Sequence, residues 1–460
     1  MIFDGFSGGE DKRWPLIHPF GPDRPAFWTA SGPLSQGRIA ERAAALAASL
    51  LDCPFAINYC EARDRFAVGL LAALSRDQTA VFPPDRTERS FSMLRADMPD
   101  VYCLSDSTLP ATDSVHVSVS DDASGGSHGA ADLSRIALER TAVKVFTSGS
   151  TGRPSGSDKT WAMLVAGAKR IPELIGMADH PHPSIVATVP SQHMYGFEHS
   201  VMYVLQGRAS AHVERPVYPA DIARCLSEVP APRVLVTTPV HLRTLVEHGG
   251  ALPKIERIVS ATAPLSEDLA GAAERCLEAP VFEIYGFTEA GSVAGRRTTA
   301  GPEWTLRQDF AARQADGRQY VEWQDFGQHI PFPDVVEILD PRRIRLHGRS
   351  EDMINVAGKR ASLNGLTAQL LEVDGVKDGV FWLPSEDLGL GLVARLIAFV
   401  VAPNSTPDRI RRELSRRMDP AFVPRTIIPV DALPRNATGK LPQESLRKIA
   451  ASHLISRGNS

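Results

Sequence analysis

The chain of 460 residues is longer than one hydrophobic core usually supports, so two or more domains are expected. Hydrophobic residues make up 43% and charged residues 23%, as in globular proteins, and a net charge of -4 with mixed signs favours no nucleic-acid partner. No segment approaches the roughly 18 apolar residues of a membrane span, and we expect no secretory signal. Five widely spaced cysteines fit reduced thiols in a cytoplasmic protein, and neither a zinc site nor a disulfide framework.

Two Ala- and Leu-rich segments in the first part of the chain predict helices over 38–51 and 63–74. The segment 104–132 is rich in Ser, Asp, Gly and Thr and predicts an exposed loop or a weak strand region. It leads to the stretch that carries the strongest functional signal.

That stretch, Val143–Lys159, has the sequence VKVFTSGSTGRPSGSDK and predicts a strand, a loop and a helix that Lys159 opens. Gly149 and Gly152 let the backbone approach a ligand closely, and the hydroxyl and N–H groups around them are donors suited to phosphate oxygens. An ordinary flexible connector explains the same composition. The motifs further along the chain favour the phosphate loop.

From 143 to 290 the predicted strands and helices alternate, which is the pattern of a parallel sheet covered by helices on both faces. Ser266, followed by two acidic residues, is the predicted N-cap of its helix. The predicted strands are Val143–Thr147, Ile185–Val189, Val234–Thr238, Arg257–Ala261 and Val281–Ile284, and the predicted helices are Lys159–Ile175, Pro239–His248 and Ser266–Leu277.

Between 303 and 347 the pattern changes to short strand-like segments separated by Asp, Gly and Pro, which predict a small antiparallel sheet. Mixed α/β character follows the polar sequence GRSEDMINVAGKR. We therefore predict an α/β protein with a large N-terminal domain at 1–348, a hinge at 349–352 and a small, mobile α+β C-terminal domain at 353–460.

Six short motifs occur along the chain in one order. They are TSGSTGRP at 147–154, PSQHMYG at 190–196, SATAPLS at 260–266, YGFTE at 285–289, GRSEDMINVAGKR at 348–360 and LPRNATGK at 433–440. Together they resemble the adenylate-forming superfamily of acyl-CoA synthetases, aryl-acid ligases, peptide-synthetase adenylation domains and firefly luciferase. The common P-loop and the dinucleotide fingerprint are excluded, because neither sequence pattern is present.

The chemistry of this superfamily explains the residue types. A carboxylate is a poor electrophile, and its attack on the α-phosphate of ATP gives an acyl-AMP, from which a thiol can take the acyl group. The first step gathers negative charge on the phosphates, so the site needs hydroxyl and N–H donors, Mg²⁺ and a lysine. The resemblance therefore implies ATP and Mg²⁺ as cofactors.

The resemblance assigns the nucleotide contacts to three of the motifs. Tyr285 would stack on adenine, Gly286 would allow close approach, and Ala261 and Thr262 would line the adenine pocket. A turn with a surface acid is the alternative interpretation of YGFTE. The phosphates would be cradled by Thr147, Ser148, Gly149, Ser150, Thr151 and Gly152.

By the same resemblance, Thr288 would bond the α-phosphate and Glu289 would hold Mg²⁺. Asp334 stands fourteen residues before Gly348, the spacing of the superfamily's ribose-binding aspartate, and is preferred to Asp340. A turn after Pro333 is the alternative explanation of Asp334. Arg349 would also contact the ribose.

Members of the superfamily rotate the small domain between the two half-reactions. Glu351 stands at the position of the hinge acid, and Gly358 and Lys359, with Arg360, would face the pantetheine tunnel. Lys440 would enter the adenylation site and bridge the substrate carboxylate and AMP, a role suited to a compact charge on a flexible arm.

One position departs from the pattern. The superfamily usually has lysine directly after the proline of the phosphate loop, where this chain has Ser155. Lys159 lies four residues further on, and our hypothesis is that it reaches the pyrophosphate instead. The departure also leaves open a non-catalytic relative that binds nucleotide or acid.

The sequence PSQHMYG is similar to the acyl-pocket motif of aryl-acid and acyl-CoA ligases. His193 would stack against a ring of the substrate or bond one of its oxygen atoms, and a histidine that only packs in the core is the alternative. Met194 stands where peptide-synthetase domains carry the aspartate that pairs the substrate's amino group, so an amino-acid substrate is not expected. The K-x-W pattern from Lys159 to Trp161 is similar to stand-alone ligases of aryl-polyene and xanthomonadin pigment pathways, which load a hydroxybenzoate-type acid onto an acyl carrier protein. An aryl- or fatty-acyl-CoA ligase is the alternative.

A basic stripe at helical spacing could meet such an acidic carrier, although a solvated helix face explains it equally well. The stripe consists of Arg411, Arg412, Arg416 and Arg417.

Overall fold

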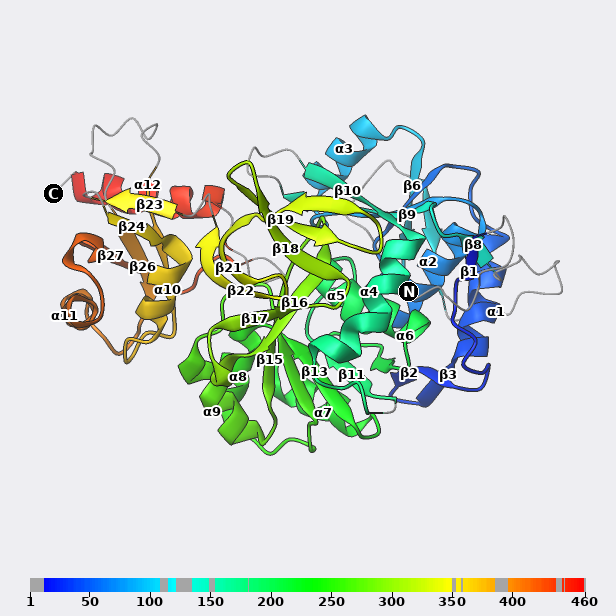
Figure 1. Ribbon diagram of the computed structural model, residues 1–460, viewed down its shortest axis with the longest axis horizontal. Helices are drawn as coiled ribbons and strands as arrows, with labels where there is room; N and C mark the ends of the chain where they lie inside the picture. The colour runs from blue at the N-terminus through cyan, green and yellow to red at the C-terminus, as the bar shows by residue number, and fades with distance from the viewer. Residues whose placement is uncertain are drawn as a thin grey trace. The chain divides into compact units, whose positions relative to one another are not determined.

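The computed structural model describes residues 12–107, 115–120, 135–148, 154–180, 182–349, 353–356, 359–384, 396–435, 441 and 443–458. The chain divides into two compact units. The first comprises Met1–Ala261 and Ala272–Arg297, and the second comprises Thr262–Gly271 and Thr298–Ser460. Figure 1 shows the course of the chain through both units.

The larger sheet of the first unit is mostly parallel, as the alternating pattern predicts. Parallel pairing joins six strands in the spatial order β2, β12, β11, β13, β14 and β15, and β3 and β16 pair antiparallel at the two ends of this series. The strands are β2 (Pro25–Thr29), β3 (Gly32–Ser35), β11 (Ser184–Ala187), β12 (Ser210–His212), β13 (Arg233–Thr237), β14 (Arg257–Ser260), β15 (Val281–Phe287) and β16 (Gly291–Arg297).

A second sheet of the first unit has the order β10, β9, β5, β4, β6 and β7, with only β10 antiparallel to its neighbour. Its strands are β4 (Phe55–Asn58), β5 (Thr79–Phe82), β6 (Val101–Ser105), β7 (His116–Ser118), β9 (Thr141–Ser148) and β10 (Pro154–Thr160). Strand β9, which precedes the phosphate loop, thus pairs with strands from the N-terminal part of the chain. It does not join the larger sheet, which contains β11 and β13 to β15. Local alternation predicts strands but does not specify which of them pair.

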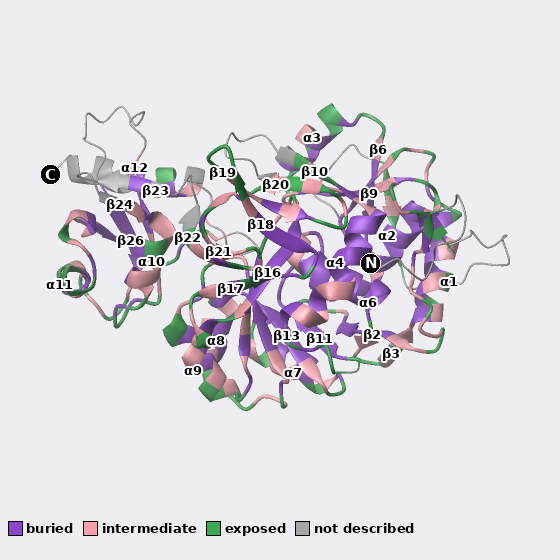
Figure 2. Ribbon diagram, viewed as in Figure 1, coloured by how far each residue is buried: buried purple, intermediate pink, exposed green. Residues whose placement is uncertain are grey.

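Apolar helices fill the space between these sheets. Nearly every residue of α2 (Arg63–Ser75) and most residues of α4 (Trp161–Leu174) are buried, which is the pattern of helices that other elements cover on most sides. A continuous helical segment follows β11 and consists of α5 (Met194–Phe197), the π-helical turn η2 (Glu198–Met202) and α6 (Tyr203–Gln206). Figure 2 shows these helices and the strands beside them as the most buried part of the unit.

The remaining helices of this part of the chain largely follow the predictions. The helix at Pro239–His248 (α8) has the predicted bounds, and the Ser266 hydroxyl accepts from the Leu269 N–H at the start of α9 (Glu267–Leu277), confirming the predicted cap. The predicted helix at 38–51 is α1 (Gln36–Ala47). The sequence analysis did not predict α3 (Glu88–Asp97), α7 (Pro219–Ser227), or the short strands β1 (Arg13–Pro15) and β8 (Arg135–Ala137).

The second unit contains the predicted antiparallel strands. One group has the order β17, β22 and β21, and another β18, β19 and β20. The strands are β17 (Glu303–Leu306), β18 (Phe310–Ala315), β19 (Arg318–Trp323), β20 (Gln328–Pro331), β21 (Asp334–Asp340) and β22 (Arg343–Arg349). β18 and β20 were not predicted, because their short segments carry few β-branched residues.

The C-terminal part of the second unit has its own apolar clusters. They are formed by residues from Ile354 onward and lie on a sheet with the order β25, β26 and β27. Its elements are β23 (Met353–Val356), β24 (Lys359–Ser362), α10 (Leu363–Leu371), β25 (Asp378–Trp382), β26 (Ile397–Val401), α11 (Pro407–Arg417), β27 (Thr426–Pro429) and α12 (Gln443–Gly458). The domain boundary at 348 and the hinge remain predictions, because residues 350–352 lie outside the described residues.

All five cysteines are free thiols, as predicted; three are buried, Cys53 is partly buried and Cys276 is exposed. In the described part of the chain, every helix falls short of the length and hydropathy needed to cross a bilayer.

Candidate functional site

The phosphate-loop stretch forms an antiparallel arm in the structure. Strands β9 and β10 pair from Ser148 opposite Pro154 down to Lys159 opposite Val143. The predicted helix start at Lys159 is therefore wrong: this residue lies in β10, and the helix begins at Trp161 after the Thr160 hydroxyl caps it. The strand has the sequence PSGSDKT, with polar residues on both of its faces. It therefore lacks the alternation of apolar and polar residues from which strands are predicted.

Of the predicted phosphate ligands, Thr147 and Ser148 lie at the end of β9. The others, Gly149, Ser150, Thr151 and Gly152, lie outside the described residues.

Lys159 faces the interior of the first unit and is 2% exposed. Its Nζ donates a hydrogen bond of 2.5 Å to the backbone carbonyl of Glu289. Burial lowers the pKa of Lys159 to about 8, although the carboxylates of Glu198, Glu289 and Asp158 act to raise it. The Lys159 amine thus contacts the YGFTE motif at the backbone carbonyl of its last residue.

The YGFTE motif ends strand β15 and opens the turn to β16. Tyr285 is buried, whereas Gly286 and Glu289 are exposed and Thr288 is partly exposed. A Cβ on Gly286 would lie 2.3 Å from the carbonyl oxygen of Gly291, so the hairpin itself requires glycine there. Tyr285, Gly286, Thr288 and Glu289 therefore share one hairpin.

The predicted metal ligand is the exposed carboxylate of Glu289. Within the described ranges, no three His, Cys, Asp or Glu side chains gather as a metal site. Magnesium at a nucleotide site is commonly held by one or two carboxylates together with the phosphates and water, so one exposed carboxylate on this turn fits that donor set.

The predicted acyl-pocket motif forms the start of the helical segment after β11. His193 occupies the N-cap position of α5, and the Tyr195 hydroxyl donates to the Val259 carbonyl at 2.9 Å. A Cβ on Gly196 would lie 2.1 Å from the Pro190 carbonyl oxygen, so glycine is needed for this close packing.

A buried polar chain crosses from this helix to β16. Ser292 donates from its N–H and its hydroxyl to one carboxylate oxygen of Glu198, at 2.9 and 2.7 Å. His199 Nε2 lies 3.2 Å from the same hydroxyl oxygen. Since the Ser292 hydrogen is given to Glu198, the imidazole is the donor to Ser292 and its proton lies on Nε2.

The second unit holds the predicted ribose residues. Asp334 begins β21 and Arg349 ends β22, and the two are paired directly across these antiparallel strands. Asp340 instead accepts hydrogen bonds from the Arg342 N–H and the Arg343 side chain in the hairpin turn. The structure thus uses Asp340 in its own hairpin turn, and the ribose role of Asp334 stays a prediction.

The predicted adenine-lining pair follows β14. Ala261 is buried, and Thr262 has a φ of 79°, a left-handed backbone conformation that is unusual for a β-branched residue. Such strain is commonly found at functional sites.

The remaining predicted residues are largely outside the described structure. Glu351, Gly358 and Lys440 are not among the described residues, and Lys359 is described only as a backbone position in β24. Their roles remain predictions.

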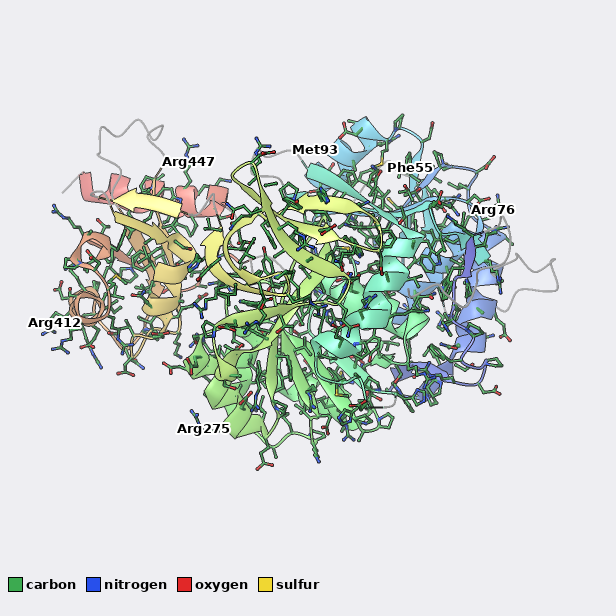
Figure 3. All side chains as sticks on the ribbon, in the orientation of Figure 1. Phe55, Arg76, Met93, Arg275, Arg412 and Arg447 are labelled. Atoms are coloured by element: carbon green, nitrogen blue, oxygen red, sulfur yellow. The ribbon has the colours of Figure 1, made fainter. Side chains whose placement is uncertain are left out.

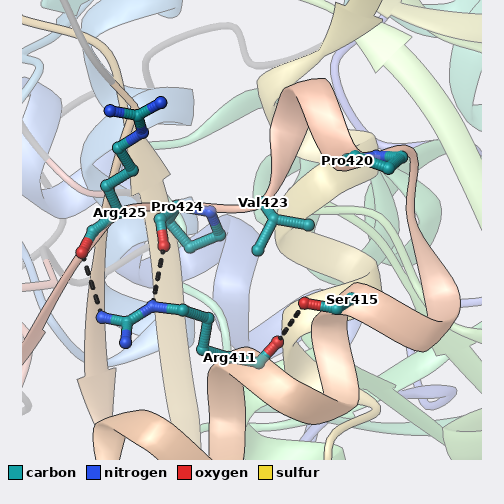
Figure 4. A pocket seen from close by; sticks show the side chains of 6 residues that line it. All are labelled: Arg411, Ser415, Pro420, Val423, Pro424 and Arg425. Carbon is teal, nitrogen blue, oxygen red and sulfur yellow. Dashed lines mark hydrogen bonds between the residues drawn. The ribbon is translucent and has the colours of Figure 1, made fainter.

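The predicted basic stripe lies on α11 and is partly used within the second unit. Arg411 donates to the carbonyls of Pro424 and Arg425 and lines a shallow pocket with Ser415 and Val423 (Figure 4). The side chains of Arg416 and Arg417 lie near acidic partners. Arg412 is exposed (Figure 3), and so is Arg425 beside the pocket.

Three residues of this region were missed in the sequence analysis. In the sequence, Glu198 and Ser292 resemble ordinary surface residues of a helix and of a strand, respectively. Arg63 resembles a solvent-exposed charged residue of a helix. Arg63 is fully buried and donates to the carbonyls of Ala187 and Val189, which fixes the end of β11. A charge inside an otherwise apolar segment is the only signal that could have identified Arg63 and Glu198.

Comparison with known proteins places the chain in a family. The family model described as AMP-binding enzyme matches residues 21–341. A 4-coumarate–CoA ligase of Halorhodospira halophila is 29% identical over 68% of this chain and 78% of its own length. A 4-chlorobenzoate–CoA ligase of an Arthrobacter species is 21% identical over 70% of this chain and 68% of its own length.

Solved structures share the fold at low sequence identity. The o-succinylbenzoate CoA synthetase of Bacillus subtilis with ATP and magnesium has a TM-score of 0.79 and 17% identity, covering 95% of this chain and 100% of its own. ATP-bound MatB from Rhodopseudomonas palustris has a TM-score of 0.76 and 18% identity, covering 97% of this chain and 98% of its own. The fold and the motifs define an adenylate-forming protein. The chain belongs to the AMP-binding enzyme family.

The buried imidazole of His199 should make stability depend on pH. Burial lowers its pKa to about 3 from 6.5, so between these values the unfolded chain binds a proton that the folded chain does not. The contribution of the neutral imidazole to the free energy of unfolding is therefore complete above pH 6.5 and is lost as the pH falls toward 3. In denaturant unfolding, wild type should lose about 2 kcal/mol to this group between pH 7 and pH 5.

His199→Gln should remove that part of the pH dependence, while the exposed His248→Gln should keep the wild-type slope. An unchanged slope in His199→Gln would contradict a buried neutral imidazole.

Proposed function

We propose that the protein activates a carboxylic acid with ATP to an acyl-AMP, releasing pyrophosphate, and then transfers the acyl group to a pantetheine thiol. The observation that carries this proposal is the contact between the phosphate-loop arm and the YGFTE turn, made by Lys159 and Glu289 in a chain of the AMP-binding family. It joins strand β10, which follows the predicted phosphate loop, to the turn that carries Glu289.

The roles of the side chains follow from their chemistry. The hydroxyls at the end of β9 and Thr288 would donate to phosphate oxygens, and the Glu289 carboxylate would hold Mg²⁺, which neutralises phosphate charge when bound. Asp334 and Arg349 would bind the ribose from their paired strands. Lys440 would bridge the carboxylate of the acid and the α-phosphate.

An aryl acid such as a hydroxybenzoate is the proposed substrate. His193 and the helix start at 194 support it, because a polar ring at an N-cap can stack on an aromatic acid and bond a ring substituent. The names of relatives acting on 4-coumarate, 4-chlorobenzoate and o-succinylbenzoate point in the same direction.

The proposed acceptor is the phosphopantetheine of an acyl carrier protein. The exposed Arg412 and Arg425 of the second unit support this choice, because carrier proteins are acidic. CoA is the second candidate acceptor, and the names of the relatives favour it, since they are CoA ligases.

Acid-dependent exchange of pyrophosphate into ATP tests the proposed reaction. Hydroxybenzoates, benzoate, cinnamates and medium-chain fatty acids should be compared, and an aryl acid should give at least tenfold more exchange than the fatty acids. AMP release with CoA against holo carrier protein then identifies the acceptor. A chain that exchanges with no acid is a binding protein, and the proposal is wrong.

Lys440→Ala should separate the two half-reactions. Acyl-AMP formation should fall by about a thousandfold or more, since a charge that stabilises the transition state is lost. Thiol transfer from presynthesised acyl-AMP should remain within about threefold of wild type. Equal losses in both steps would show that this lysine does not act in adenylation alone.

Charge reversal on the second unit should distinguish the acceptors. Arg412→Glu with Arg425→Glu should raise the KM for holo carrier protein about tenfold and leave pyrophosphate exchange unchanged. Arg275→Glu, an exposed arginine of α9, is the matched control (Figure 3). Unchanged carrier loading would assign these arginines to a solvated surface.

A further inference from the structure

A cluster of buried charged and polar side chains lies under the turn that carries Glu289. Its members come from three separate elements of the first unit: β10, the π-helical turn η2 and β16. They are Lys159, Glu198, His199 and Ser292, and none is more than 4% exposed. Burial of so many polar groups together is costly unless each has a defined partner.

The cluster holds the turn at both of its ends. Lys159 Nζ binds the carbonyl of Glu289 on one side, and the Glu198 carboxylate binds the N–H and hydroxyl of Ser292 on the other. Only Ala290 and Gly291 lie between these two attachment points. The position of the Glu289 backbone is therefore fixed by a cation and an anion that are themselves enclosed by protein.

The turn is shaped to fit the carboxylate. Gly291 has a φ of +75°, and a Cβ at this position would lie 2.3 Å from an oxygen of Glu198. A side chain here would collide with the carboxylate, so glycine is required both for the conformation and for the space.

Two consecutive residues of the π-helical turn reach the same partner. Glu198 and His199 are adjacent in η2, yet both bind Ser292. Single π turns within helices recur at functional sites, where they redirect side chains.

Lys159 and Glu198 carry opposite charges in the same buried cluster, and the Glu198 carboxylate acts to raise the pKa of Lys159 against the larger effect of burial. Buried charge pairs of this kind contribute little net stability and can fix one geometry instead. An ammonium bound to a backbone carbonyl inside the protein is poorly placed to follow a nucleotide phosphate.

We propose that Lys159 and Glu198 are positioning residues that fix the Thr288–Ser292 turn and so aim the Glu289 carboxylate toward Mg²⁺–ATP, and that Lys159 is not a phosphate ligand. This inference rests on the proposed function. It replaces the hypothesis that Lys159 substitutes for the lysine missing at Ser155.

Nucleotide binding measured by calorimetry distinguishes the two roles. A positioning lysine acts through Glu289, so Lys159→Met should leave the Kd for metal-free ATP within about twofold of wild type. Its Kd for ATP with saturating Mg²⁺ should weaken about tenfold, which corresponds to about 1.4 kcal/mol. A phosphate-binding lysine would instead weaken metal-free ATP about tenfold as well.

Glu198→Gln provides the decisive comparison, because a carboxylate would repel phosphate and cannot be its ligand. It should show the same Mg²⁺-dependent loss as Lys159→Met, and the double variant should be no worse than either single one. Lys159→Arg should recover part of the loss. Lys144→Met is the matched control, since Lys144 lies on the adjacent strand β9 and pairs with Asp158 on the exposed face of the arm, opposite to the face of Lys159.

The milder Ser292→Ala removes one hydrogen bond to Glu198 and tests the same link if the charge variants fold poorly. It should raise the Mg²⁺ concentration for half-maximal pyrophosphate exchange about threefold, with the KM for the acid unchanged. The inference would be overturned if Glu198→Gln and Ser292→Ala both kept the wild-type Mg²⁺ dependence, or if Lys159→Met lost binding of metal-free ATP. Either result would leave the proposed function standing. A wild-type chain that binds no Mg²⁺–ATP would overturn the proposed function first and the inference with it.

Discussion

The hydrogen bond between the Lys159 ammonium and the Glu289 carbonyl is the contact on which the candidate site depends. The lysine belongs to the six-stranded sheet of the first unit, and the glutamate follows a strand of the larger sheet. The bond therefore joins the two sheets at the point where their functional motifs end. Since a buried ammonium must have a partner, this contact also fixes how the hairpin arm packs on the hairpin that carries Glu289.

Glycines in this region serve the protein backbone as well as any ligand. Gly196, Gly286 and Gly291 each lie where a methyl group would overlap a neighbouring oxygen atom of the protein. A motif glycine is commonly interpreted as room for a nucleotide. Here the packing of the first unit requires these glycines already, so their presence alone does not show where a nucleotide would lie.

The sequence was sufficient for local structure and for the family, and less so for pairing. The bounds of α8 and the cap of α9 were predicted because their signals are local. The sheet to which β9 belongs was not, because its partner strand lies about sixty residues earlier in the chain. The role of Glu198 was not predicted for the same reason, because its partner Ser292 is 94 residues away in the sequence. The choice of Asp334 over Asp340 rests on its spacing to a motif and stays a prediction.

The pairing of β10 with β9 has a consequence for how this chain can vary among related sequences. Successive residues of a strand face opposite sides, and here Asp158 meets Lys144 on the outer side while Lys159 points inward. Gaining or losing a single residue inside Pro154–Lys159 would turn the ammonium to solvent and bring an acid into the core. Length changes between Ser148 and Pro154 leave that parity intact. Relatives that keep the inward lysine should therefore differ in the length of the loop and not in that of the strand behind it.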